Sequence, residues 1–337
     1  MTPQPELSDT DVEELLGAYA LDACDPAEAA AVEVVLARRP DLAAEAARLA
    51  NAAAWIGATE ALEPPRGLRA AVMGTTRPDP DDPNETAVAL YRTQSEQFEE
   101  AARLVADAGG LDEVTTNGLT AYELVVHEAA QESLLAQAVG RTVVPEVPTT
   151  DIDARTRDFV ALLDDRSLVA VLDVWRESVD VNCGWATDSA EGVARWRGLE
   201  LDRADAVVVR AFETWIHADD LRRVLGQPGR PPVPSHLALM ADLAGRSLGA
   251  SLALVGRVRP GKTARLVLTG DGGGAWTVPM EPGATAADPD VTLTADVVDW
   301  CLLVGDRVSP SAIPHRVDGD AALAADLLAA APALATL

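Results

Sequence analysis

A segment dense in proline and acid interrupts this chain before residue 86. Residues 77–85 read RPDPDDPNE, with three prolines and four acidic residues. Proline fixes φ and lacks a backbone N–H, and the charges favour contact with water, so the segment is typical of a stiff linker. A second proline-rich break, PGRPPVP, spans residues 228–234. The two breaks predict three modules, at residues 1–76, 86–227 and 235–337.

The first module is predicted to be a small set of helices. The motif DPAE at residues 25–28 places an N-cap acid before a proline and a second acid, which together form a capping box. The apolar residues that follow recur with helical spacing up to the next proline. We expect helices at about residues 10–21, 26–38 and 41–62, and a short one after residues 64–65.

The second module has the periodicity of long amphipathic helices. TAYE at residues 120–123 is another capping box, and it opens a helix that runs through His127 to about Val139, where Gly140 closes it. Long helices in series predict an antiparallel bundle of four or more. Further helices are expected at about residues 86–110, 153–164, 166–179 and 203–225.

The third module changes from helical to strand periodicity. After a helix at about 235–254, the stretch ARLVLTGDGGGAWTVPM at 264–280 alternates on both sides of a glycine-rich turn, which predicts a hairpin. DVTLTA at 290–295 predicts another strand, and helices are expected at 297–305 and after 318–320. The predicted fold class is therefore mostly α, with a C-terminal α+β part.

The charge of the chain limits its partners. It carries 27 Lys+Arg against 54 Asp+Glu, a formal net charge of −27, so no nucleic-acid or membrane partner is expected. No uncharged apolar run reaches about 18 residues, and the acidic N-terminus is unlike a signal peptide. Cys24, Cys183 and Cys301 are far apart and are expected to be small buried residues in a reducing compartment. We therefore expect a cytoplasmic protein.

Two histidines and a glutamate are the candidate metal ligands of this sequence. Glu213 and His217 lie four residues apart on one predicted helix, which places them on one face, and His127 lies on a separate bundle helix. Two imidazoles and a carboxylate are the ligand set of a catalytic divalent metal site. The alternative is a solvated ion pair on one helix and a core histidine on the other. His236 and His315 are expected at the surface.

Residues 86–337 resemble the mycothiol-dependent maleylpyruvate isomerase family. Residues 117–128, NGLTAYELVVHE, follow the family signature P-G-W-T-V-R-D-L-V-A-H-L in Gly, Thr, Leu, Val and His, but carry Asn117 and Leu119 where the family has Pro and Trp. Residues 213–221, ETWIHADDL, follow the second signature, E-x-W-I-H-A-x-D-L. The resemblance implies a DinB-like bundle in which His127, Glu213 and His217 bind the metal and Asp220 supports them.

The same resemblance implies an activity. The expected metal is zinc, and the expected cosubstrate is mycothiol, whose thiolate adds to a small electrophile such as the activated double bond of a maleyl-type acid. The chain is thus predicted to be a thiol transferase or isomerase.

The third module resembles the family's smaller C-terminal domain, which is related to the sterol-carrier fold. Residues 305–307, Gly-Asp-Arg, stand where that domain has Gly-Arg. The resemblance implies that Arg307 is a catalytic residue that clamps a substrate carboxylate. The alternative is an arginine that faces the negative end of a helix dipole.

Residues 9–75 resemble the zinc-binding anti-sigma module of actinobacteria. The family's His and two Cys ligands are replaced here by Val35, Arg39 and Leu42, so no zinc is expected in this module. The alternative function is a soluble anti-sigma-like regulator, which would contact a sigma factor through residues 1–76 and use the bundle as a thiol or metal sensor.

Overall fold

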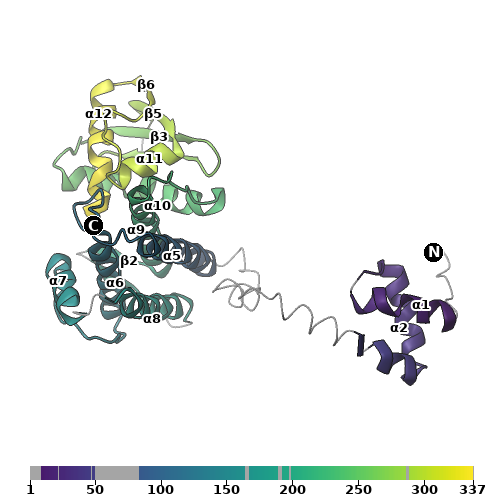
Figure 1. Cartoon of the computed structure of the whole chain (residues 1–337). Coiled ribbons are helices and arrows are strands. Elements are labelled where there is room, and N and C mark those ends of the chain that lie inside the picture. Colours follow the sequence, from purple (N-terminus) through teal and green to yellow (C-terminus); the bar gives the residue numbers. More distant parts are fainter. Residues whose placement is uncertain are drawn as a thin grey trace. The chain divides into compact units, whose positions relative to one another are not determined.

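The chain forms two compact units, Met1–Gly74 and Thr75–Leu337. The computed structural model describes residues 9–21, 23–46, 48–49, 83–163, 167–188, 192–196, 199–285 and 288–336 (Figure 1). Residues 77–82 of the predicted linker lie outside the described residues. Residues 83–85 were expected in that linker but form the first turn of a helix, because proline is tolerated where the N–H has no intrahelical partner.

The N-terminal unit has the expected helices in its described part. Helix α1 (Asp9–Ala20) packs on α2 (Pro26–Leu36), and residues 40–46 are helical. Asp25 accepts hydrogen bonds from the Ala27 and Glu28 N–H groups at 2.8 and 2.9 Å, which confirms the capping box. The remainder of the helix expected at 41–62, and the one after 64–65, lie outside the described residues.

Two of the three residues that stand at the expected zinc-ligand positions of the N-terminal module are part of its hydrophobic core. Val35 and Leu42 are buried, at 1% and 7% exposure, in the small core of the N-terminal unit, and Arg39 pairs with Asp41 at 2.6 Å. Val35 and Leu42 thus contribute to the packing of this core, and Arg39 makes a local surface ion pair. A sigma-factor contact through residues 1–76 stays a prediction.

The predicted bundle helices are present in the second unit. They are α5 (Pro83–Asp107), α6 (Ala121–Ala138), α7 (Ile152–Leu162), α8 (Leu168–Thr187) and α9 (Arg203–Val224). Thr120 and Glu123 form the expected reciprocal capping box of α6, with hydrogen bonds of 3.2 and 2.9 Å. A short antiparallel hairpin, β1 (Ala194–Trp196) and β2 (Leu199–Leu201), lies between α8 and α9 and was not predicted.

The C-terminal part is α+β. Helix α10 (Pro234–Leu254) is followed by a four-stranded sheet of order β4-β3-β5-β6, in which β3 and β5 are parallel and the other pairs antiparallel. Strand β5 is followed directly by helix α11, and β6 is followed by α12. The bounds are β3 (Thr263–Thr269), β4 (Gly274–Pro279), β5 (Val291–Asp296), α11 (Val297–Val304), β6 (His315–Gly319) and α12 (Ala321–Ala330).

Helix α10 joins the sheet to the bundle. It contacts α9 on one side and β4, α11 and α12 on the other (Figure 1). A Cβ atom at Gly245 would lie 2.6 Å from the ring of Trp276, so this glycine is what lets α10 approach β4 closely. The ring nitrogen of Trp276, on β4, donates to the side chain of Asp242, on α10, at 2.9 Å. These two contacts fix α10 against strand β4 of the sheet.

One hydrophobic core runs through the second unit. Trp215 of α9, Leu248 of α10 and Trp300 of α11 are fully buried in the same cluster. The modules predicted at 86–227 and 235–337 thus lie in one compact unit, because α10 and α11 share their apolar faces with α9. By length and composition α10 could also cross a bilayer, but half of its apolar window is buried, as in a core helix.

Candidate functional site

Two of the predicted site histidines lie side by side in the bundle. His127 on α6 and His217 on α9 have ring centroids 5.7 Å apart and nearly perpendicular planes. Their helices are started by the Thr120 capping box and by Asp202, whose side chain accepts from the Asp205 N–H at 2.8 Å. Local capping thus fixes both helix starts, and packing of α6 against α9 brings the imidazoles together.

The hydrogen bonds of His127 indicate which of its nitrogens carries the proton. The Thr156 hydroxyl donates to the Ile152 carbonyl at 2.8 Å, so its oxygen accepts from His127 Nδ1 at 3.2 Å. His127 Nε2 lies 3.4 Å from the amide nitrogen of Gln131, which can only donate. This arrangement leaves Nε2 as the basic nitrogen of the ring.

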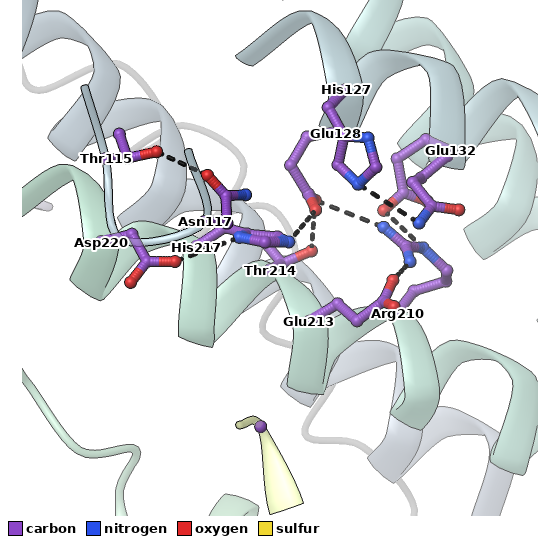
Figure 2. Close-up of polar contacts among 12 residues, drawn as sticks. Thr115, Asn117, His127, Glu128, Glu132, Arg210, Glu213, Thr214, His217 and Asp220 are labelled. Carbon is purple, nitrogen blue, oxygen red and sulfur yellow. Dashed lines mark hydrogen bonds and ion pairs between the residues drawn. The ribbon is translucent and has the colours of Figure 1, made fainter. Parts of the chain in front are cut away.

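His217 is oriented by a buried carboxylate. Its Nδ1 lies 3.3 Å from Asp220 Oδ2, and its Nε2 lies 3.7 Å from Glu128 Oε1 (Figure 2). Burial raises the pKa of Asp220, but hydrogen bonds from His217 and Arg307 outweigh it and hold the pKa at about 2. Asp220 is therefore ionised and accepts a hydrogen bond from the Nδ1–H group of His217, which directs Nε2 toward the interior of the bundle.

Glu213 lines the same cavity as His217, but its carboxylate has another partner. It lies one turn before His217, as predicted, but its carboxylate pairs with Arg210 on the same helix. Arg210 also binds Glu128 at 3.3 Å and Glu132 at 3.1 Å. Within the described ranges, no group of three His, Cys, Asp or Glu side chains is placed to hold a metal ion. The physical reason is that one buried guanidinium attracts all three carboxylates.

The sequence analysis did not identify the buried polar network beside the histidines. Glu128 and Glu132 are fully buried, and Arg210 is 1% exposed. Tyr91 donates to Glu132, Asn182 donates to the same carboxylate at 3.0 Å, and burial raises the pKa of Glu132. In the described part of the chain, Glu128 Oε1 has no hydrogen-bond partner although it is buried.

A signal for this network is present in the sequence of α9. Arg210, Glu213, His217 and Asp220 recur every three or four residues, so they share one face of the helix. A polar stripe of this kind on a helix that otherwise packs into the core indicates a buried polar site. Glu128 and Glu132 show the same helical spacing on α6, four residues apart and each next to another polar residue, His127 or Gln131.

Arg307 lies where the chain leaves α11. Its N–H bonds to the Leu302 carbonyl at 2.8 Å and the Asp306 N–H bonds to Leu303 at 3.0 Å, which is a Schellman ending, with Asp306 at φ 56°. The guanidinium donates to Asp220 at 2.6–3.0 Å and to the Gly305 carbonyl at 2.7 Å. Arg307 was expected to clamp a substrate carboxylate, but its charge is already paired with Asp220.

A cavity of about 130 Å³ nevertheless collects three of the predicted residues. Glu213, His217 and Arg307 all line it, together with apolar side chains of α9, α10, α11 and the C-terminal residues. His127 lines a separate cavity of about 440 Å³ with Asp153, Thr156 and Arg157 among its walls. The two histidines therefore line different cavities, His217 the smaller one and His127 the larger one.

Comparison with known proteins gives two structural matches. No protein-family model matches the sequence, and no curated protein matches it. The matched structures are crystal structures of the mycothiol-dependent maleylpyruvate isomerase and of its histidine-to-alanine mutant, at 19% and 18% identity. Each has a TM-score of 0.46 and covers 70% of this chain and 93% of the other.

Proposed function

We propose that this chain is a thiol-dependent transferase or isomerase that uses a divalent metal, zinc in the first instance, and mycothiol as its thiol. The proposed metal ligands are His127, His217 and Glu213. The observation that carries the proposal is the position of His127 and His217, which come from two helices and have ring centroids 5.7 Å apart. The two sequence signatures that contain these histidines support it.

The chemistry of the surrounding groups suits a cation. Two imidazoles and a carboxylate are borderline ligands that accept zinc and related divalent metals. Three carboxyl groups, on Glu128, Glu132 and Glu213, meet the single guanidinium of Arg210, so the network carries an excess of acid. The buried oxygen Oε1 of Glu128 also lacks a hydrogen bond within the described residues. A cation near the histidines would balance these groups.

The roles of the chain's own residues follow from their contacts. Thr156 orients His127, and Asp220 orients His217. A metal bound there would stabilise the thiolate of the cosubstrate and so make it nucleophilic at neutral pH. The apolar wall of the 130 Å³ cavity excludes water from the electrophile beside His217.

The proposal extends to the family of each part of the fold. We assign helices α5–α9 to a DinB-like bundle and the part after Pro234 to a sterol-carrier-like α+β domain. The order of helices and of the mixed sheet supports this assignment.

Elemental analysis of the purified full chain tests the proposal. We expect roughly one divalent metal per chain in the wild type. His217→Ala and His127→Ala should each lose it, whereas His315→Ala, at an exposed histidine on β6, should retain it. Turnover is then measured as consumption of mycothiol with a small electrophile. A wild-type chain that neither contains metal nor binds added zinc contradicts the proposal.

A further inference from the structure

The cavity beside His217 has an apolar wall with few polar groups. Phe212, Ile216, Leu243, Val304 and Leu334 are among its lining residues. Its polar lining residues are Glu213, His217, Ser247 and Arg307. A mostly apolar cavity with a few convergent polar groups is the usual form of a small-molecule site.

The size of the cavity limits its occupant. Its volume is about 130 Å³. An apolar cavity of about 150 Å³ in a protein core accommodates a benzene molecule. The space beside His217 therefore suits a compact group of about the size of one six-membered ring.

The charges around the cavity do not favour an anion. Arg307 carries the fixed positive charge among the lining residues, and its guanidinium donates to Asp220 at 2.6–3.0 Å. Asp220 is fully buried, so this pair is held in a region of low dielectric. Glu213 adds a carboxylate to the wall, and because it shares the guanidinium of Arg210 with Glu128 and Glu132, its charge is only partly compensated. A ligand carboxylate would have to compete with Asp220 for Arg307 and would face Glu213 as a like charge.

The metal of the proposed function does not change this balance. A divalent ion held by His127, His217 and Glu213 would bring two positive charges. The thiolate of the cosubstrate, together with the two carboxylates that Glu128, Glu132 and Glu213 carry in excess of Arg210, would offset both, so no net positive charge would be left to attract a second anion.

We propose that the electrophile bound in this cavity is a compact, uncharged and largely apolar molecule, about the size of one ring, rather than a maleyl-type acid. This rests on the proposed function, because it takes the cavity beside His217 as the substrate site. The polar group of the electrophile lies at the end formed by Glu213 and His217, and its apolar body lies against Phe212 and Leu243.

Binding of three probes to the full chain tests the proposal. Benzyl alcohol, benzoate and maleate are compared by saturation-transfer NMR, with and without added zinc. We expect benzyl alcohol to bind about tenfold more tightly than benzoate or maleate. Ser247→Phe fills the cavity from its half-buried wall on α10 and should abolish benzyl alcohol binding. Ala253→Phe adds the same ring at an exposed position of α10 and should leave binding unchanged.

The outcomes separate this inference from the proposed function. Benzoate or maleate binding as tightly as benzyl alcohol, and lost in Ser247→Phe, would overturn the choice of an uncharged ligand. Benzyl alcohol binding that survives in Ser247→Phe would overturn the choice of cavity, and Ser247→Leu repeats that test with a smaller side chain if the phenylalanine variant does not fold. Absence of metal with intact benzyl alcohol binding would instead remove the metal-dependent function.

Discussion

Arg307 donates to both carboxylate oxygens of Asp220, which lies 87 residues earlier in the chain. Asp220 in turn accepts from His217, so the end of α11 is tied to the orientation of a site histidine on α9. Under the proposed function, Arg307 would act on the site through Asp220, as a positioning residue. In the proposed site, the polar cavity residues Ser247 and Arg307 come from the part of the chain that follows the bundle, and Glu213 and His217 come from α9.

Loss of this pair should destabilise the protein strongly. Arg307→Met leaves the buried charge of Asp220 without its main partner, and we expect a loss of about 3 kcal/mol in the free energy of unfolding. Arg223 also donates to Asp220, at 2.8 Å, but is 38% exposed, so Arg223→Met should cost less than about 1 kcal/mol. Urea unfolding measures both. Equal losses in the two variants would show that Arg307 has no special role.

The pH dependence of stability should report Asp220. Its pKa is lowered from 3.8 to about 2 in the folded chain, so the ionised group contributes stability above about pH 4 that is lost as the pH falls toward 2. Asp220→Asn cannot show this loss. The stability difference between wild type and Asp220→Asn should therefore shrink between about pH 4 and pH 2 in urea titrations. A difference that stays constant over that range contradicts the assignment.

The close packing of α11 on α9 should depend on Gly305. A Cβ atom there would lie 2.7 Å from Ile216 Cδ1. Gly305→Ala should therefore destabilise the chain by about 1–3 kcal/mol, as overpacking does. Ile216→Val removes that methyl group, so the double variant should recover part of the loss. The Ile216 Cγ1 atom, 2.9 Å from the same Cβ position, remains in the double variant, so the recovery is only partial. Thermal unfolding of the three variants checks this, and no recovery would mean that the contact with Ile216 Cδ1 is not the cause.

The buried Arg210 should be essential for folding. Arg210→Met leaves Glu128 and Glu132 buried without their guanidinium, and we expect a loss of about 3–5 kcal/mol or failure to fold. Arg195, 80% exposed and paired with Glu200, is the matched control, and Arg195→Met should change stability by less than about 0.5 kcal/mol. Soluble yield and urea unfolding give the comparison. An Arg210→Met chain of wild-type stability would contradict the network.

Features set by neighbouring residues could be predicted from the sequence. The capping boxes at Asp25 and Thr120 depend on residues three positions apart, and both are present in the structure. The β1–β2 hairpin was missed because its strands have three residues each, too few for an alternating pattern. The helix α5 begins inside the predicted linker because its proline fits a first helical turn.

The contacts of the site depend on tertiary packing and were less predictable. The pair of Arg210 and Glu213 joins residues three positions apart on α9, but the contacts of Arg210 with Glu128 and Glu132 on α6 depend on how the two helices pack. The partner of Arg307 is Asp220, on another helix. The residues around Arg307 in the sequence could therefore suggest only an arginine that binds a substrate carboxylate or one that faces a helix end. Which groups neutralise one another is decided by packing, which a single sequence does not reveal.

Cobalt titration of the full chain, followed by mycothiol, tests the central claim most directly. We predict that Co²⁺ binding produces visible ligand-field absorption, that mycothiol shifts it, and that His127→Ala and His217→Ala each abolish it while His315→Ala does not. Absorption that is absent in the wild type, or unchanged in both site variants, would contradict a metal centre built on the histidine pair.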